Sequence, residues 1–322
     1  MNSTDIINDT YNSKEENILR RQERLHTDLA LEEREKFQDD VEVSGVALNR
    51  ECFEDNMIII TTVDILNEHG AQVMGKAKGT YVTIEAPDME NDEKIAQKVS
   101  EYVAREIHRI NKKINMKKVI VAGLGNREVT PDMLGPMVTD ELYVTNHIYA
   151  EFGSEAFDDK KPLKVCAIAP GVMAQTGMET KELIKGIAAQ INPDCVFVID
   201  ALAARSVSRL NTTIQLTDTG ISPGSGVGNH RNAINSETIG VPVIAIGVPT
   251  VVDAFTIIND SMEKYLEGIG MTKQEISSFM NGFAVSNATN MIVTPKNIDE
   301  SVENIARVIA SALNSFIASM HI

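Results

Sequence analysis

The most constraining feature of this sequence is an alternation, from residue 117 onward, of short apolar runs with segments of helical spacing. Strands are expected at Lys118–Gly123, Leu163–Ala169, Asp194–Ile199, Asn211–Leu216 and Val241–Ile246. Helices are expected at Asp132–Val144, Glu179–Ile191, Ala201–Leu210, Val252–Ile258 and Asn297–Ser319. Strands that are apolar on both faces and alternate with helices form a parallel sheet covered on both sides. The sequence therefore predicts an α/β fold with a mainly parallel sheet flanked by helices.

The chain before residue 117 has a different pattern of predicted secondary structure. Residues 40–87 favour extended structure, with strands at Met57–Ile65 and Gly79–Glu85 around a turn at Asn67–Gly70, and a helix follows at Asn91–Asn115. We therefore expect a small β-rich and helical part, residues 29–116, attached to an α/β core of residues 117–322. Residues 1–28 are polar and charged, and within them only Ser13–His26 predicts a short helix.

Bulk properties exclude several classes of function. The net charge of −16 argues against direct binding of nucleic acid, which requires a basic footprint. No stretch approaches the roughly 18–20 apolar residues of a membrane span. The polar, acidic N-terminus lacks the pattern of a secretory signal, so a cytoplasmic location is expected. The three cysteines have no metal-type or redox-type spacing.

Glycines after the first strand of the core raise the possibility of a nucleotide site. Gly123 and Gly125 match the first two positions of a dinucleotide fingerprint, but Glu128 stands where the third glycine is required. A carboxylate at that place would repel a pyrophosphate. The chain also has no GxxxxGK[ST] motif, and a nucleotide site is therefore disfavoured.

Two carboxylates follow predicted strands, where ligands of open α/β sheets bind. Asp200 ends the apolar run 196–199, a position that suits either a helix cap or chemistry. Asp132 follows Thr130-Pro131, and by position alone it is better explained as an acid at a helix start. Two such carboxyl groups brought close cannot both ionise readily. One can then activate a water molecule as a base while the other donates a proton.

Other catalytic patterns are missing from the sequence. No Ser lies in a G-x-S-x-G elbow, and no His lies in an HExxH or similar metal pattern, so no metal site is predicted. The loop Ser222–Asn229 is equally well explained as a surface connection or as a surface of donors for a peptide. Its Ser225 and Asn229, with the adjacent His230, are candidate substrate-binding residues.

Long segments of the chain resemble the germination protease family of spore-forming bacteria. They include GLGN at 123–126, VTPDMLGP at 129–136, APGVM at 169–173, IDALAAR at 199–205, NTTIQ at 211–215, SPGSGVGN at 222–229, GVPVIAIGVPTVVDA at 240–254 and VTPK at 293–296. The resemblance runs from about residue 26 to the end. Between about Leu266 and Phe283 the chain lacks an insertion that longer members of the family carry.

The resemblance implies a self-processing endopeptidase that degrades small acid-soluble spore proteins during germination, in the spore core, as a homotetramer. It also implies that Asp132 and Asp200 are an aspartic-type catalytic pair that needs no cofactor. The family is similar in fold to hydrogenase maturation proteases, which use carboxylates and a His around nickel. No His of this chain clearly fills that third position.

The family's substrates are cut after an acidic residue in a Thr-Glu-apolar-Ala-x-Glu pattern, and this chain contains a similar segment of its own at Thr27–Glu32, TDLALE. The resemblance therefore implies a zymogen cut between Asp28 and Leu29, with residues 1–28 as the propeptide. An acidic substrate needs a basic partner, and Arg205, near Asp200, is a candidate because an Arg fork suits a carboxylate. A surface role for Arg205 remains the simpler explanation.

Two alternatives stay open from sequence alone. One is a related metal-dependent maturation-type peptidase, and the other is a non-catalytic peptide-binding or small-molecule-binding module on the same fold.

Overall fold

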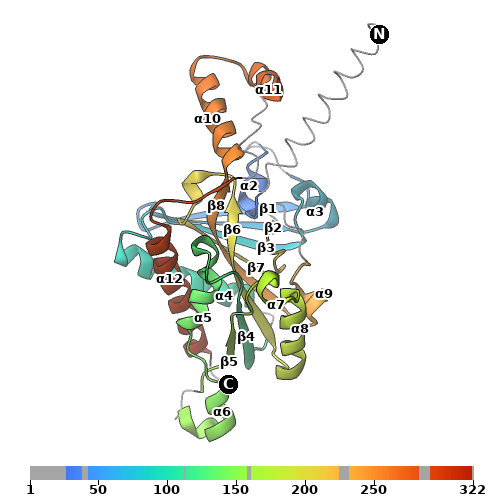
Figure 1. Cartoon of the computed structure of the whole chain (residues 1–322), viewed down its shortest axis with the longest axis vertical. Coiled ribbons are helices and arrows are strands. Elements are labelled where there is room, and N and C mark those ends of the chain that lie inside the picture. The colour runs from blue at the N-terminus through green and yellow to red at the C-terminus, as the bar shows by residue number, and fades with distance from the viewer. Residues whose placement is uncertain are drawn as a thin grey trace.

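The structure, a computed structural model, describes residues 27–37, 43–111, 114–157, 161–224, 232–282 and 291–320. The described strands form one mixed nine-stranded sheet in the order β1-β2-β3-β7-β8-β6-β4-β5, with β9 paired to β8 (Figure 1). The strands are β1 Val46–Phe53, β2 Ile58–Ile65, β3 Gly79–Glu85, β4 Lys118–Gly123, β5 Lys164–Ile168, β6 Cys195–Ala204, β7 Thr213–Thr217, β8 Val243–Asp253 and β9 Ile292–Val293. The helices are α2 Ala30–Arg34, α3 Glu68–Met74, α4 Glu93–Asn111, η1 Thr130–Asp132, α5 Leu134–Asp140, α6 Asn146–Phe152, η2 Ser154–Phe157, α7 Met173–Thr176, α8 Thr180–Ile191, η3 Val207–Arg209, α9 Ser236–Ile239, α10 Ala254–Gly268, α11 Lys273–Gly282 and α12 Ile298–Ser319.

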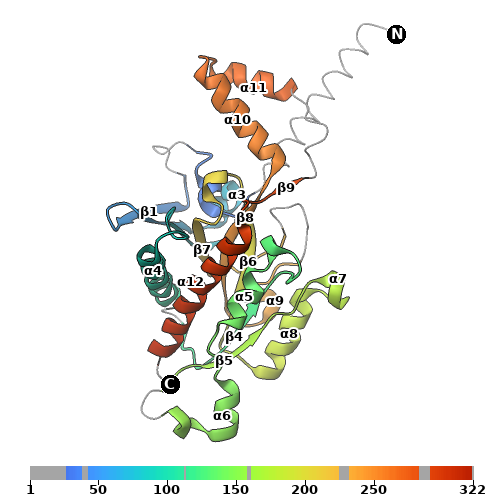
Figure 2. The same ribbon diagram turned by 60° about the vertical axis from the view of Figure 1, so that its left-hand side comes forward.

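The α/β class predicted from sequence is confirmed, and its parallel part is the half of the sheet formed by β8, β6, β4 and β5. Strand β6 shows why the core strands are apolar at successive residues and not only at alternate ones. Its Val196 and Val198 join one buried cluster, with residues of α8 and α9, whereas Phe197 and Ile199 join the other, with residues of α4, α5 and α12. Both faces of the strand are therefore covered, as Figures 1 and 2 show for the two helix layers.

The β-rich N-terminal part continues the same sheet. Strands β1, β2 and β3 are antiparallel, and β7 joins them to the parallel half by antiparallel pairing with both β3 and β8. The turn predicted at Asn67–Gly70 is wrong, because α3 begins there. The Asn67 side chain caps this helix by accepting a hydrogen bond of 2.9 Å from the N–H of Gly70, and left-handed Gly75 ends it.

Two predicted helices beside the candidate carboxylates are also wrong. The helix expected at Ala201–Leu210 does not form: Ala201–Ala204 are strand, because β6 continues to Ala204 by pairing with Val248–Val252 of β8, and the 3₁₀ turn η3 follows. The Ala-rich sequence favours a helix, but the pairing outweighs that weak preference. The helix expected at Asp132–Val144 is replaced by the single 3₁₀ turn η1 and the shorter α5.

Helices α10 and α11 project beyond the sheet in both views and share a small cluster of Leu266 and Ile276 (Figures 1 and 2). Across the described ranges, no helix combines the length and apolar character that crossing a membrane requires.

The packing of α12 on the sheet gives a stability prediction. Phe316 is fully buried, with its ring centroid 5.8 Å from that of Phe197 on β6 and 4.7 Å from that of His108 on α4. We expect Phe316→Ala to lower the free energy of unfolding by about 3–5 kcal/mol, because it leaves a cavity between sheet and helices. Urea denaturation measures the loss. Tyr265→Ala, at a site 64% exposed, serves as control and should change stability by no more than about 0.5 kcal/mol.

Candidate active site

Asp200 lies inside β6 rather than after it, and only 5% of it is exposed. It lies opposite Gly247 of the parallel strand β8. One carboxylate oxygen accepts a hydrogen bond of 3.0 Å from the N–H of the next residue, Ala201. The strand therefore holds this carboxyl group rigidly at the carboxyl-terminal half of the parallel sheet.

Asp132 is the last residue of the turn η1, which packs directly against the end of β4. The N–H of Asn126 donates to its side-chain Oδ2 at 2.9 Å and is 3.1 Å from its carbonyl oxygen. This close approach needs glycine. A Cβ on Gly125, whose φ is +115°, would lie 1.9 Å from the Asp132 carbonyl oxygen, and one on Gly123 would lie 2.0 Å from the Gly135 carbonyl oxygen. The two glycines that suggested a nucleotide loop thus position Asp132.

A second contact ties the same turn to β8. Thr250, which is fully buried, donates its hydroxyl to the carbonyl oxygen of Pro131 at 2.7 Å. Its own carbonyl oxygen accepts a hydrogen bond of 2.9 Å from Thr294 Oγ1. The turn with Asp132 is therefore attached to the two strands β4 and β8, on either side of the strand that carries Asp200.

The structure brings Asp132 and Asp200 to one cavity of about 370 Å³. Apolar residues and glycines dominate its lining, with Leu124, Val129, Val172, Leu202 and Val251 among them, and Asp28 lines it too. A small apolar cavity with a few convergent acids is the usual form of a binding site. Within the described ranges, no three His, Cys, Asp or Glu side chains are grouped so that they could hold a metal ion.

The third acid of this cavity, Asp28, belongs to the segment that resembles a substrate. Its N–H donates to the carbonyl oxygen of Ala203 at 3.1 Å, and its Oδ2 accepts from the N–H of Ala203 at 2.9 Å. The next two residues are fully buried. Leu29 packs with Leu202, Ala204, Leu210 and Val252, whereas Ala30 packs with Val63, Ile65, Met74 and Tyr81. Asp28 and Leu29 are thus seated on the extension of β6, and Ala30 lies against β2, α3 and β3.

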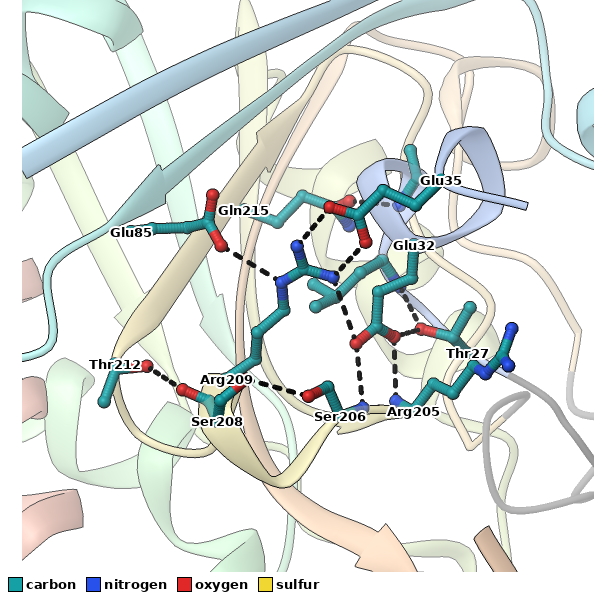
Figure 3. A network of polar contacts seen from close by, with 12 residues as sticks. Thr27, Glu32, Glu35, Glu85, Arg205, Ser206, Ser208, Arg209, Thr212 and Gln215 are labelled. Atoms are coloured by element: carbon teal, nitrogen blue, oxygen red, sulfur yellow. Dashed lines mark hydrogen bonds and ion pairs between the residues drawn. The ribbon is translucent and has the colours of Figure 1, made fainter. Parts of the chain in front are cut away.

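Glu32, another acid of this segment, is held by several donors (Figure 3). It is 2% exposed and accepts hydrogen bonds from the N–H of Arg205 at 2.7 Å and of Ser206 at 3.0 Å, as well as from the Thr27 hydroxyl. The guanidinium of Arg209 forms an ion pair with it at 3.3 Å. A buried carboxylate with this many donors is fully compensated.

Arg209 is a candidate site residue that the sequence interpretation missed. It is 9% exposed, with a two-pronged contact to Glu35 at 2.6 and 2.7 Å and a further one to Glu85 at 3.1 Å. Burial alone would lower the pKa of its guanidinium, but Glu35, Glu85 and Glu32 together raise that pKa above its ordinary value. The sequence carries one signal for it, a second arginine four residues after Arg205.

Arg205 itself meets Glu32 through its backbone N–H, and Figure 3 shows its guanidinium directed away from that carboxylate. Its positive charge instead acts on Asp260 of α10. Burial raises the pKa of Asp260, and Arg205 partly opposes this. The guanidinium that lies against Glu32 is thus that of Arg209 and not that of Arg205.

The loop predicted to bind substrate is only partly described. Pro223 and Gly224 line the cavity with the two aspartates. Ser225, Asn229 and His230, the three candidate residues of this loop, lie outside the described residues.

Comparison with known proteins agrees with the sequence resemblance. The profile of the germination protease family matches residues 25–289. Proteins named germination protease are similar over about 90% of this chain: one from Clostridium perfringens is 42% identical, one from Caldanaerobacter subterraneus subsp. tengcongensis 44% and one from Bacillus subtilis 38%, with 94%, 93% and 92% of their own lengths covered. Among solved structures, the [NiFe] hydrogenase maturation protease HycI of Thermococcus kodakarensis matches at 16% identity with a TM-score of 0.33, over 65% of this chain and 98% of its own.

The contact between Gly125 and Asp132 can be tested with a matched pair of glycines. Gly125→Ala should lower the free energy of unfolding by more than the roughly 1–2 kcal/mol that a left-handed conformation costs, because the new Cβ also overlaps the Asp132 carbonyl. Gly240, a left-handed residue with φ +91° and open space around its Cβ, should show only the conformational cost on change to Ala. Urea denaturation compares the two, and equal losses would contradict the close packing of the Asp132 turn.

Proposed function

The chain belongs to the germination protease family, and we propose that it is an endopeptidase that begins the degradation of small acid-soluble spore proteins during spore germination. Its place of action is the cytoplasm of the spore core. Spore proteins are its substrates, and its working form is a homotetramer. We propose neither a membrane partner nor direct contact with nucleic acid for this protein. Its net charge of −16 disfavours binding to nucleic acid.

Asp132 and Asp200 are the proposed catalytic pair. In a shared cavity with a mostly apolar lining, one carboxylate is ionised and takes a proton from the attacking water, while the other, protonated, donates to the leaving amine. The hydrogen bonds that hold each aspartate through Ala201 or Asn126 preset their orientation. The reaction needs no cofactor in this scheme.

The single observation that carries the proposal is that Asp28 lines the same cavity as the two aspartates. The segment around it fits the substrate pattern position by position. Leu29 fills an apolar site, Ala30 a fully enclosed site, and Glu32 a site that supplies three donors, from Arg205, Ser206 and Arg209. We infer that the chain is a zymogen that cuts its own bond between Asp28 and Leu29 and releases residues 1–28.

Conservative variants test the aspartate pair. Asp132→Asn and Asp200→Asn, each in the full chain, should abolish release of the tail and cleavage of a Thr-Glu-Ile-Ala-Ser-Glu peptide, because the amide can neither accept the water proton nor donate from an acid. Mass spectrometry of the chain and the peptide measures both reactions, and circular dichroism checks the fold. Full activity in both variants would reject the pair, and a mature N-terminus other than Leu29 would reject the proposed cut.

The site for Glu32 gives a separate prediction. Glu32→Ala should slow self-cleavage at least about tenfold, because it removes charge-assisted hydrogen bonds, each of which contributes about 1.5–3 kcal/mol. Arg209→Met should slow it as well, and the double variant should be little slower than the slower single one, since both changes remove one interaction. Glu33, on the same helix but paired with Lys36, is the control for Glu32. Equal rates for Glu32→Ala and Glu33→Ala would contradict this role.

A further inference from the structure

The carbonyl oxygen of Asp28 accepts two side-chain hydrogen bonds. Lys76 Nζ donates to it at 3.1 Å, and Gln215 Nε2 donates at 3.2 Å. Lys76 also donates to the carbonyl oxygen of Thr27 at 3.0 Å. The Asp28 carbonyl is half of the peptide bond to Leu29, so the two donors hold the oxygen on which negative charge would develop during cleavage of that bond.

Both donors are held by the fold. Gln215 lies on β7, between β3 and β8, and is 6% exposed. Its Oε1 accepts from the N–H of Ala30 at 2.7 Å, which leaves its amide N–H groups directed at the Asp28 oxygen. Lys76 follows Gly75, the left-handed residue that ends α3, and this turn brings its side chain over the segment.

The electrostatic setting of Lys76 suits stabilisation of an anion. It lines a second cavity, of about 620 Å³, with Asp28 and Gln215. Burial lowers the pKa of the Lys76 ammonium, an effect that Lys36 adds to and that Asp28, Glu33 and Glu32 oppose. A positive charge that has lost much of its water interacts more strongly with charge that appears on a neighbouring oxygen.

Asp28 lines both cavities, that of Lys76 and that of Asp132 and Asp200. The residue before the proposed cut is thus placed between the acids and the two donors. In an acid-only mechanism, a carboxylic acid must itself protonate the carbonyl oxygen. Here that oxygen already has a cation and an amide donor, which leaves both carboxyl groups for the water and the leaving amine.

We propose that Lys76 and Gln215 stabilise the oxyanion formed when the Asp28–Leu29 bond is hydrolysed, an inference that rests on the self-processing proposed above. A water oxygen bonds to the Asp28 carbonyl carbon while the ionised carboxylate takes the water proton. The carbonyl π electrons move onto the oxygen, which Lys76 and Gln215 hold. The C–N bond then breaks as that oxyanion reforms the carbonyl, and the protonated carboxyl gives its proton to the Leu29 nitrogen. The products are the Asp28 carboxyl group and the Leu29 amine.

A purely structural role, in which Lys76 only anchors the segment, makes a different prediction. Anchoring contributes to the seated state before reaction, whereas oxyanion stabilisation lowers the barrier from that state. The two roles are separated by measuring independently how firmly residues 27–35 are held on the fold and how fast the bond is cleaved.

The experiment uses the full chain. The first-order rate of tail release is measured for the unchanged chain, Lys76→Met, Lys76→Arg and Gln215→Glu, the last of which loses the donor but keeps the acceptor for Ala30. Seating is measured as hydrogen-exchange protection of a peptide containing residues 27–35, with Asp132→Asn added to each variant to keep the tail intact. Lys78→Met is the control, since Lys78 is an exposed lysine of the same loop.

We expect Lys76→Met to slow tail release about 10²–10³-fold, the usual effect of losing one oxyanion donor, with protection of 27–35 reduced less than tenfold. Gln215→Glu should slow release at least as much, because a carboxylate would repel the oxyanion. Lys76→Arg should release the tail at a rate within about tenfold of that of the unchanged chain. The control Lys78→Met should release it at the same rate as the unchanged chain. If Lys76→Met does not fold, Gln215→Glu decides by the same criterion.

The inference would be overturned if Lys76→Met and Gln215→Glu released the tail at the unchanged rate. It would also be overturned if their rates fell only in proportion to the protection lost by residues 27–35. Cleavage of the spore-type peptide by a chain that never releases its own tail would overturn it too, yet leave the endopeptidase proposal standing. Failure of both reactions in the unchanged chain would reject the two together.

Discussion

The pairing of β6 with β8 beyond Ile199 is the constraint on which the rest of the site depends. Without it, Asp200 would stand at a strand end before a mobile or helical segment. With it, the strand runs on to Ala204, so that Asp200 is fixed and Ala203 has a backbone edge on which Asp28 is seated. The N–H groups just beyond, of Arg205 and Ser206, then bind Glu32. One strand thus carries a candidate catalytic acid and the surface that binds the segment around Asp28, where we propose the cut.

The chain is strongly acidic, and this makes the placement of its few cations important. Beside the segment 27–32, one arginine, Arg209, forms ion pairs with three glutamates: Glu32 and Glu35, within and at the end of α2, and Glu85 of β3. A buried ion pair contributes little net stability once its desolvation is counted, but removal of one partner is costly. The ion pairs of Arg209 therefore add little net stability, and in the function proposed above Arg209 selects an acidic residue at the position of Glu32. Lys76 has a comparable place at the other end of the segment, against the Asp28 carbonyl.

Glycine has a part in the site that differs from its part in a phosphate-binding loop. Gly123 and Gly125 let the turn that carries Asp132 approach the end of β4 within backbone contact distance. Thr250 fixes the same turn from β8. Asp132 is consequently held from both strands that flank β6, so its position relative to Asp200 follows from the sheet.

Local patterns in the sequence determined the class of fold and the approximate positions of the core strands, because apolar periodicity is a local property. They also indicated Asp200, whereas position alone favoured a helix-start role for Asp132, and its place as a candidate partner came from the family resemblance. Only the tertiary structure decided that Ala201–Ala204 is strand and that Arg209 rather than Arg205 directs its guanidinium at Glu32. Those outcomes depend on partners distant along the chain: Arg205 and Glu32, for example, are 173 residues apart. No local pattern encodes such a meeting, since it is the sheet pairing that brings the two segments together.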